Sequence, residues 1–583
     1  MPSPILLRFT ASACVPIGCL LFACHSGQTR ELPNLVGQAG SVNDAASDGS
    51  NDPEPDEAGT GGTSRGGSDG GGGTAPQGGT VGGGALADHE LPDATIIDST
   101  LVDVDASPIC GDGIWDVSLD EDCDDGNRQH SDGCENDCKR TRVEHIGVGW
   151  GFDCALSSGG GVKCWGQDVY GALGQGTAAA DLTSPSQVAP LDFGTTRRVI
   201  QLSVGYSHSC VRFEDKKARC WGRNEYGQLG INSQSDYGDS PDELLSNLQD
   251  LALSNVQTIT AGRYNTCAIA GTAGLEKLYC WGSNIRGELG LGNTTVLDQP
   301  GSAIELNASV SGVIAGTRWV CALLSGAARC WGGYTYGVLG VGPTANWVGD
   351  NESPNLSSFN VKGLPPGAPT MLSGRSSTLC ALSGGDVYCW GRNLAGEAGY
   401  PVASYGTEIW QPPRAVNLGG VSLVQISAST NFGCALDDEG FIRCWGYDPD
   451  DGGLGYPGIG QIGVERDPVF DYELMRGGDG GVSDGIDAGP VTPGLPLGAV
   501  DLGDFDETPG PDRATRVEAG PDRTCALMEG GTVRCWGDNA AGVLGYDPSI
   551  TYIGITESPA QAYERLGHAD VKIFEPLPSD GGP

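Results

Sequence analysis

The feature that most constrains the fold of this chain is a cysteine-containing unit that recurs seven times. Each unit has a first cysteine, a short turn and a Cys-Trp-Gly step, usually followed by Gly-x-Leu-Gly. The first cysteines are Cys154, Cys210, Cys267, Cys321, Cys380, Cys434 and Cys525, and the Cys-Trp-Gly steps begin at Cys164, Cys220, Cys280, Cys330, Cys389, Cys444 and Cys535. Successive first cysteines lie 56, 57, 54, 59, 54 and 91 residues apart. A period of this length is typical of a repeat architecture.

Each unit is predicted to form a β-hairpin in which the second cysteine returns opposite the first. Because side chains alternate along a strand, the first cysteine and the residue two positions on share one face, and the Trp beside the second cysteine points to the other face. A sheet that is apolar on both faces needs cover on both, which radially packed propeller blades provide. The sequence therefore predicts an all-β fold, a seven-bladed β-propeller over residues 139–583, with the seven Trp side chains in its core.

The cysteine count agrees with a disulfide bond in every hairpin. Of 21 cysteines, Cys14 and Cys19 fall in a predicted signal segment and Cys24 is a predicted lipid anchor. Fourteen of the remaining 18 lie in the hairpins. The other four are Cys110, Cys123, Cys134 and Cys138. We expect nine bridges with no thiol left over, which favours an oxidising compartment.

The repeat, with its Cys-Ala-Leu, Cys-Trp-Gly and Gly-x-Leu-Gly steps, resembles the regulator of chromosome condensation repeat. Proteins of that family form seven-bladed propellers, so the resemblance implies this fold over about residues 142–583. The founding eukaryotic member is a guanine-nucleotide exchange factor for a nuclear GTPase. Another member is a secreted bacterial inhibitor of β-lactamases. The resemblance is specific for the fold, and it leaves the activity open.

The N-terminal region is predicted to export and anchor the chain. Residues 1–24 form a short apolar segment ending in Leu21-Phe22-Ala23-Cys24, which resembles the lipobox of bacterial lipoproteins. The resemblance implies a diacylglycerol group on Cys24 and, with His25 next to it, an outer-membrane anchor; an ordinary signal peptide is the alternative. Residues 25–109 are rich in Gly and Asp and are predicted to form a disordered tether, because they contain too little apolar surface to fold.

Residues 110–138 are predicted to form a small module held by two disulfides. Their pattern CGDG…EDCDDGN…DGC…C resembles a cysteine-rich repeat of secreted myxobacterial proteins. Zinc binding is disfavoured because no CxxC spacing is present. Calcium binding by the acidic loops stays an alternative, but the EF-hand spacing is absent, so we predict no metal site.

Two further segments lie within the repeat region. Residues 450–515 are predicted to be a low-complexity insertion between the sixth and seventh units, which accounts for the 91-residue interval. Near the C-terminus, Ser558-Pro559 and residues 571–573 resemble the linking strands of earlier repeats. We expect them to pair with the first blade and close the ring, because closure removes exposed sheet edges.

Charge and motif content argue against several classes of function. The chain has 33 Lys and Arg against 74 Asp and Glu, a net charge of -41, which disfavours nucleic acid as a partner. No metalloprotease motif, P-loop or catalytic Ser/His/Asp or Cys/His set is present. We therefore predict no catalytic residues, no cofactor and no enzymatic activity.

The segment that leads into each first cysteine varies while the frame repeats, which favours a binding role. If these segments occupy equivalent positions, their aromatic and Arg residues form a ring on one rim, and such residues are typical interface anchors. Packing on the neighbouring blade is the alternative. The predicted binding residues are Trp150, Tyr206, His208, Tyr264, Trp319, Phe432 and Arg523.

The sequence predicts an exported, monomeric surface lipoprotein whose propeller is a protein-binding or adhesion scaffold. The expected partner is a protein or glycan at the cell surface, and the only membrane contact is the lipid anchor. The alternatives are a secreted enzyme inhibitor and, from the family name alone, a nucleotide exchange factor. A polysaccharide-cleaving enzyme would need a carboxylate pair on one rim, which the sequence does not place.

Overall fold

The computed structural model describes residues 110–113, 121–176, 181–342, 347–367, 369–394, 396–400, 412–447, 461–462, 499–504, 512–554, 558–568 and 570–574. The signal segment, Cys24 and the predicted tether therefore lie outside the described residues, as does most of the predicted insertion at 450–515. Within the described part, no helix is both long and apolar enough to cross a membrane.

The repeat region folds into seven antiparallel sheets of three or four strands, each built from consecutive strands, as the repeat predicts. The sheets are blade 1, β1 (Val143–Val148), β2 (Phe152–Ser157) and β3 (Val162–Gly166); blade 2, β4 (Val199–Val204), β5 (His208–Phe213) and β6 (Ala218–Gly222); blade 3, β7 (Val256–Ala261), β8 (Asn265–Ala270) and β9 (Lys277–Gly282); blade 4, β10 (Val310–Ala315), β11 (Trp319–Leu324), β12 (Ala327–Gly333) and β13 (Trp347–Val348); blade 5, β14 (Met371–Gly374), β15 (Thr378–Ser383), β16 (Asp386–Gly391) and β17 (Arg414–Ala415); blade 6, β18 (Leu423–Ala428), β19 (Phe432–Asp437), β20 (Ile442–Tyr447) and β21 (Gln461–Ile462); and blade 7, β22 (Ala514–Ala519), β23 (Arg523–Met528), β24 (Val533–Asp538) and β25 (Tyr552–Ile553).

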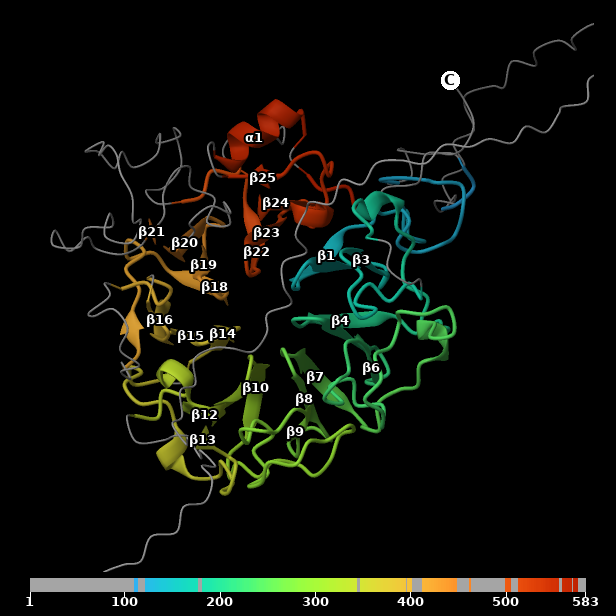
Figure 1. Cartoon of the computed structure of the whole chain (residues 1–583). Helices are drawn as coiled ribbons and strands as arrows, with labels where there is room; N and C mark the ends of the chain where they lie inside the picture. The colour runs from blue at the N-terminus through green and yellow to red at the C-terminus, as the bar shows by residue number, and fades with distance from the viewer. Residues whose placement is uncertain are drawn as a thin grey trace, which may run out of the picture. The chain divides into compact units, whose positions relative to one another are not determined.

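The seven sheets are arranged in a ring, with the first strand of each blade toward the centre (Figure 1). Each first strand contacts the first strand of the next blade, and β22 contacts β1. The all-β, seven-bladed propeller is therefore confirmed. In the part of the chain that the structure describes, one α-helix, α1 (Pro559–Leu566), and short 3₁₀ turns connect or flank the blades. The described 3₁₀ turns are Pro185–Gln187, Leu245–Asn247, Thr335–Gly337, Ser357–Phe359 and Ala540–Gly542.

Each hairpin places its two cysteines directly opposite each other. Cys154 pairs in register with Cys164, and the same register recurs in the other six blades. All seven pairs form disulfides, with Cα atoms 4.0–4.1 Å apart. The predicted hairpin bridges are thus present, and they lie in the core between blades.

The Trp of each Cys-Trp-Gly step is fully buried, and six of the seven, Trp536 excepted, donate a hydrogen bond to the preceding blade. The indole N–H of Trp221 donates to the carbonyl of Ala172 at 3.0 Å, and that of Trp281 donates to Gln228 at 2.9 Å. Each acceptor is the x residue of the preceding Gly-x-Leu-Gly step. The remaining pairs are Trp331 with Glu288, Trp390 with Val338, Trp445 with Glu397, and Trp165 with Val543. The Cys-Trp-Gly step of one unit and the Gly-x-Leu-Gly step of the preceding unit therefore supply the donor and the acceptor of one hydrogen bond between blades.

The ring closes where blades 7 and 1 meet, and there the backbone N–H of Val143 donates to Gly531 O at 2.9 Å. Residues Pro559–Leu566 form α1, which begins with a capping box between Ser558 and Gln561. The backbone N–H of Val571 donates to Val533 of blade 7, so the predicted pairing of this segment with blade 1 is wrong. Contact with blade 1 comes instead from Lys163, whose ammonium donates to the carbonyl of Ile573 at 2.7 Å.

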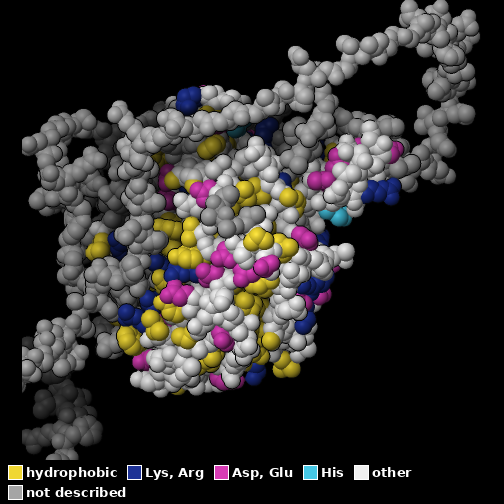
Figure 2. All heavy atoms as spheres, turned by 45° about the vertical axis from the view of Figure 1, so that its right-hand side comes forward, with side chains coloured by type: hydrophobic (Ala, Val, Ile, Leu, Met, Phe, Trp, Pro, Cys, Tyr) yellow, Lys and Arg dark blue, Asp and Glu magenta, His cyan; other side chains and the backbone are white. Residues whose placement is uncertain are grey.

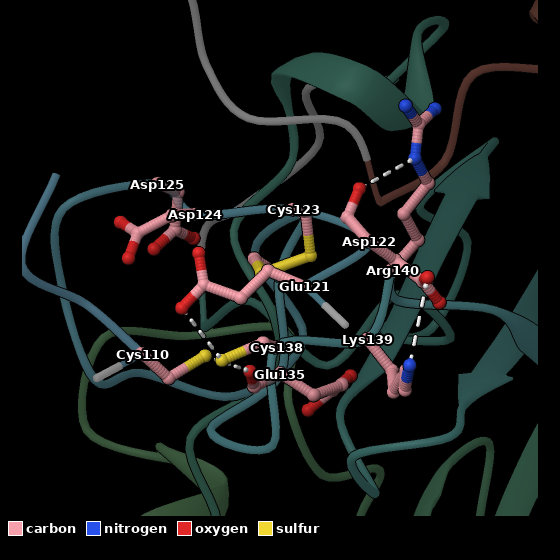
Figure 3. The surroundings of a disulfide bond; sticks show 12 residues. Cys110, Glu121, Asp122, Cys123, Asp124, Asp125, Glu135, Cys138, Lys139 and Arg140 are labelled. Atoms are coloured by element: carbon pink, nitrogen blue, oxygen red, sulfur yellow. Dashed lines mark hydrogen bonds and ion pairs between the residues drawn. A yellow bond between two sulfur atoms is a disulfide. The ribbon is translucent and has the colours of Figure 1, made fainter. Parts of the chain in front are cut away.

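The cysteine-rich module has one disulfide rather than two. Cys123 and Cys134 are bonded, whereas Cys110 and Cys138 are buried thiols whose sulfur atoms face each other (Figure 3). Cys110 donates to the carbonyl of Glu135, and Cys138 donates to the carboxylate of Glu121. Burial, with Cys110 and Glu121 adding to it, raises the pKa of Cys138 to about 12. The expected count of nine bridges is therefore wrong by one, because in the structure these two thiols are held by hydrogen bonds.

Candidate functional site: an aromatic and arginine rim

The turn between the first and second strands of each blade lies on one rim of the propeller, and in blades 1 to 5 neighbouring turns are joined by backbone hydrogen bonds. Trp150 N–H donates to Tyr206 O at 3.0 Å, and Tyr206 N–H donates to Gly262 O at 3.1 Å. The series continues with Arg263 N–H to Gly316 O at 3.3 Å. This backbone connection holds the turns of blades 1 to 4 in fixed positions, so the side chains they carry are preorganised.

An inner row of aromatic and Arg side chains follows these turns. Trp150 stacks on Tyr206 with ring centroids 4.7 Å apart and planes 17° apart. The guanidinium of Arg263 lies over both Tyr206, at 4.2 Å, and Tyr264, at 5.0 Å. The guanidinium of Arg318, in blade 4, lies 5.1 Å from the ring centroid of Tyr264. Stacking and cation–π contacts therefore run without a break from blade 1 to blade 4.

An outer row lies on the loops that precede the Gly-x-Leu-Gly steps. Arg223 lies 4.8 Å from the ring of Tyr170 and 5.9 Å from that of Tyr264, which joins the two rows. Tyr226 packs edge-on against Tyr264 at 5.2 Å. Farther along, Arg286 lies 5.1 Å over Trp347. We call the ten residues of both rows the aromatic rim: Trp150, Tyr170, Tyr206, Arg223, Tyr226, Arg263, Tyr264, Arg286, Arg318 and Trp347.

In blades 2 and 3, the second residue of the Gly-x-Leu-Gly step has a buried side chain that accepts a hydrogen bond from the loop of the outer row. Gln228 is fully buried and accepts from Tyr226 N–H at 2.9 Å. Glu288 is 1% exposed and accepts from Arg286 N–H at 2.7 Å. Burial raises the pKa of Glu288, and the hydrogen bond from Arg286 opposes this. The rim is thus supported by buried polar groups, which favours a single conformation.

The aromatic rim covers only one side of the ring. At the turn positions of blades 5 to 7, small or polar residues replace the aromatic and Arg residues: Ser376, Ser377, Thr430, Asn431, Pro521 and Asp522. The outer row ends in the same way, since the residue before Gly-x-Leu-Gly is Tyr170, Tyr226, Arg286 and Tyr336 in blades 1 to 4 but Ala541 in blade 7. Tyr336 and Ala541 share the same left-handed backbone, with φ of 54°. The turn therefore does not require a Tyr, and the large side chains of blades 1 to 4 need another explanation.

The structure separates the seven predicted binding residues into two groups. Trp150, Tyr206 and Tyr264 belong to the aromatic rim, although Tyr264 is only 6% exposed. The other four are buried between blades, so the predicted ring of all seven is wrong and the packing alternative holds for these. They are His208, Trp319, Phe432 and Arg523, each 3% exposed or less.

Strand parity explains the four errors. His208, Trp319, Phe432 and Arg523 each lie two residues before a first cysteine, so they point to the same buried face as that cysteine. Their contacts are internal: His208 Nε2 lies 2.8 Å from Thr266 Oγ1, and Trp319 donates to Ser376 O at 2.6 Å. Burial lowers the pKa of His208 to about 3, so this imidazole stays neutral.

The sequence prediction included no residue of the outer row. Tyr170, Tyr226 and Arg286 stand next to the repeating Gly-x-Leu-Gly step. Comparing the residue before Gly-x-Leu-Gly across the units would have shown that it is Tyr or Arg in blades 1 to 4 and Ala in blade 7. Trp347 carries no repeat signal, because it lies on the fourth strand of blade 4, β13.

The rim is basic within an acidic protein. On the face shown in Figure 2, acidic and hydrophobic side chains are interspersed and basic side chains form small groups. The rim contributes four Arg residues, of which Arg223 pairs with Glu225. Burial alone would lower the pKa of Arg223, but the Glu225 carboxylate outweighs it and the pKa is raised. Among the described residues, no group of three or more His, Cys, Asp or Glu side chains could hold a metal ion.

Comparison with known families agrees with this architecture. Residues 160–212 and 220–269, and separately residues 199–228 and 514–543, match the family described as regulator of chromosome condensation (RCC1) repeat. The matched segments lie in blades 1 to 3 and in blade 7. Residues 104–139 match a domain of unknown function, DUF4215, which covers the cysteine-rich module.

Two curated proteins match part of the chain. The chain is 31% identical over 229 residues to the human probable E3 ubiquitin-protein ligase HERC4, covering 38% of this chain and 20% of that protein. It is 27% identical over 307 residues to the ultraviolet-B receptor UVR8 of Arabidopsis thaliana, covering 52% and 64%. In each case the chain covers less than two thirds of the relative.

Two solved structures are similar to this chain at low sequence identity. Yeast RCC1 (Prp20), in its structure bound to Kap60, is 16% identical, with a TM-score of 0.48 over 72% of this chain and 84% of that one. Human WBSCR16 is 16% identical, with a TM-score of 0.48 over 68% and 92%.

Proposed function

We propose that this protein is an exported surface lipoprotein, anchored through Cys24, whose RCC1-repeat propeller binds a partner protein through the aromatic rim. The observation that carries the proposal is that, at the two turn positions immediately before the second strand, aromatic or Arg side chains occur in blades 1 to 4 but not in blades 5 to 7. A purely structural requirement of the repeat would place similar side chains on all seven blades. Tyr, Trp and Arg are also the residues that dominate binding energy at protein interfaces.

Export is supported by the eight disulfides, because such bonds persist in oxidising compartments. The rim needs no further chemistry to act, since a rigid set of stacked side chains loses little conformational entropy on binding. The same surface would serve an adhesion scaffold or a secreted inhibitor of an enzyme, and the identity of the partner distinguishes these roles.

Substitutions on the rim should abolish partner capture without unfolding the propeller. We expect Arg263→Ala and Tyr206→Ala each to weaken binding by at least about tenfold, since each removes two ring contacts at the centre of the rim. The oxidised full chain is used as bait against outer-membrane and culture-supernatant proteins, and the captured protein is then titrated by surface plasmon resonance.

Thr430→Ala is the matched control for these rim variants, because Thr430 occupies the same turn position as Tyr206 and Arg263 but in blade 6. The control should bind like the unmodified chain. The rim proposal is wrong if the captured protein binds the Arg263→Ala and unmodified chains equally, or if Thr430→Ala causes the same loss.

The lipid anchor is tested separately from the rim. Expressed in a Gram-negative host, the chain should incorporate labelled palmitate and sediment with the membrane fraction. A Cys24→Ser variant should lose both the label and membrane association, while partner binding by the purified propeller is unchanged. Recovery of unlabelled chain in the soluble periplasmic or culture fraction, with or without Cys24, would favour plain secretion.

A further inference from the structure

A second site lies outside the rim, where the cysteine-rich module meets blades 1 and 2. It is a cleft of about 940 Å³. One wall is the module, another is the segment that leads into β1, and the floor is the β2–β3 turn at Ser158–Gly161. The connector Thr195–Arg198, which precedes β4, completes it. The lining residues are Asp122, His130, Ser131, Glu135, Asn136, Asp137, Lys139, Arg140, Arg142, Ser158, Gly159, Gly160, Gly161, Thr195, Thr196, Arg197 and Arg198.

The floor is held together by hydrogen bonds between module and blade. Ser131 Oγ lies 2.5 Å from Ser157 Oγ and accepts from Gly161 N–H at 3.0 Å. Ser158 Oγ donates to the Glu135 carboxylate at 3.3 Å. A Cβ added at Gly159 would lie 2.2 Å from the end of the Glu135 side chain, so a larger residue there would displace that carboxylate. The module and blade 1 therefore form one preorganised surface.

The walls carry an unusual density of positive charge for this protein. Five Lys and Arg side chains line the cleft against three acidic ones, whereas the whole chain has 33 against 74. Arg197 forms ion pairs with Asp215 and Asp250 and stacks on Phe213. Its charge is therefore already paired, and its role in the cleft is structural.

The remaining basic groups are exposed or only weakly paired. Lys139 and Arg140 flank Asp122: the ammonium lies 3.5 Å from its carboxylate, and the Arg140 Nε donates to its carbonyl at 3.4 Å (Figure 3). Arg198 donates to Ser158 O and lies 3.7 Å from Glu144, and both of these charged side chains are about half exposed. Arg142 is exposed at the cleft edge.

We propose that this junction cleft binds an acidic oligosaccharide. The lining consists of charged, amide, hydroxyl and glycine groups, with no aromatic or large aliphatic side chain. A protein partner needs apolar anchors, and single-stranded nucleic acid needs aromatic stacking surfaces, and the cleft offers neither. Guanidinium groups match carboxylate or sulfate groups, while the Ser, Thr and Asn side chains match sugar hydroxyls.

The large negative charge of the chain does not prevent the junction cleft from binding an acidic oligosaccharide. At physiological ionic strength the Debye length is about 8 Å, so exposed acidic groups farther away are screened and the local basic groups dominate. A ligand that contacts both module and blade also stabilises their junction, because binding to the folded state alone adds to its stability. This site is independent of the rim and of the proposed protein partner.

The test is isothermal titration of the oxidised full chain at 0.15 M salt with three probes of similar length. These are a galacturonate oligomer, which carries carboxylates, a sulfated dextran oligomer, and neutral dextran. We expect saturable binding of one or both acidic oligomers, with the stronger one identifying the anionic group, and no binding of neutral dextran. Binding should be accompanied by a rise in the melting temperature.

Arg198→Gln and Arg142→Gln should each weaken that binding by about tenfold, since each removes a charge-assisted contact. Arg513→Gln is the matched control. Arg513 precedes the first strand of blade 7 as Arg198 precedes β4, and it donates to Glu439 O as Arg198 donates to Ser158 O. All three variants are surface changes, and their melting temperatures without ligand report that the fold is intact.

Several outcomes would overturn the proposal. Absence of binding by both acidic oligomers, equal binding of neutral dextran, or affinity unaffected by Arg198→Gln and Arg142→Gln would each do so. Preference for a polyglutamate peptide over both acidic oligomers would show that the cleft takes a protein segment instead. None of these results bears on the rim, because Arg263→Ala leaves the cleft intact.

Discussion

Replacing Arg523 by Ala should lower the free energy of unfolding of the propeller by about 3–5 kcal/mol, the cost of breaking a buried ion pair from one side. Arg523 is 1% exposed, and its guanidinium lies 2.7 Å from the carboxylate of fully buried Asp153. It also donates to the carbonyls of Gly149 and Phe152, each at 3.1 Å. These contacts join blade 7 to blade 1, so the variant leaves a buried carboxylate unpaired at the ring closure.

The destabilisation should grow as the pH rises. Burial raises the pKa of Asp153, and in the folded protein Arg523 opposes that shift. Without Arg523, the folded-state pKa of Asp153 rises further above its unfolded value. A raised carboxyl pKa contributes stability only at low pH and loses it as the pH passes through the folded pKa. Urea unfolding at pH 5 and pH 8 should therefore show a smaller penalty at pH 5.

A second substitution makes this prediction specific. Combining Arg523→Ala with Asp153→Asn removes the unpaired charge and should recover part of the lost stability at pH 8. Equal stability of Arg523→Ala and the unmodified chain, or a double variant less stable than Arg523→Ala, would contradict a closing ion pair between blades 7 and 1.

Reducing the hairpin disulfides should unfold the propeller at 25 °C. The seven bridges close loops with sequence separations of 9–13 residues, each worth about 2–3 kcal/mol in the chain-entropy model. Together they contribute roughly 15–20 kcal/mol on that basis, which exceeds the total stability of about 5–15 kcal/mol usual for a domain. The measurement is circular dichroism after reduction in denaturant and removal of the denaturant.

Loss of a single disulfide should be tolerated. A variant that lacks one bridge therefore distinguishes the loss of all the disulfides from damage to the core. The double variant Cys380→Ala, Cys389→Ala should fold and lose about 2–3 kcal/mol. If the fully reduced chain, verified by mass, regains the native spectrum and melting temperature, the hairpin bridges are not required for stability.

The fold was predictable because its signals are local and repeated. The register of Cys154 with Cys164 follows from a short hairpin, and the burial of Trp165 follows from side-chain alternation. The same alternation, applied to the residue two before each first cysteine, would have placed His208 and Arg523 in the core. The helix after Ser558 also had a signal, since Ser558 and Gln561 have the spacing of a capping box.

The remaining features depend on contacts between distant segments. The rim arises because Arg263 of blade 3 reaches Tyr206 of blade 2, and no single repeat carries both partners. The junction cleft requires Ser131 and Glu135 of the module to meet the glycines of the β2–β3 turn. Charge composition alone pointed away from any anionic ligand, because it averages over the chain and hides a local basic group such as Arg198.

The indole-to-carbonyl hydrogen bonds give the ring a direction. At six of the seven junctions, a blade presents an acceptor on its Gly-x-Leu-Gly flank to the Trp donor of the next blade, so these blades meet head to tail, as subunits do in cyclic oligomers. Such contacts end only when the last acceptor finds the first donor, here Val543 O and Trp165 Nε1, 2.9 Å apart. A chain shortened by one blade would expose complementary ends, and it should associate end to end instead of remaining a single closed molecule.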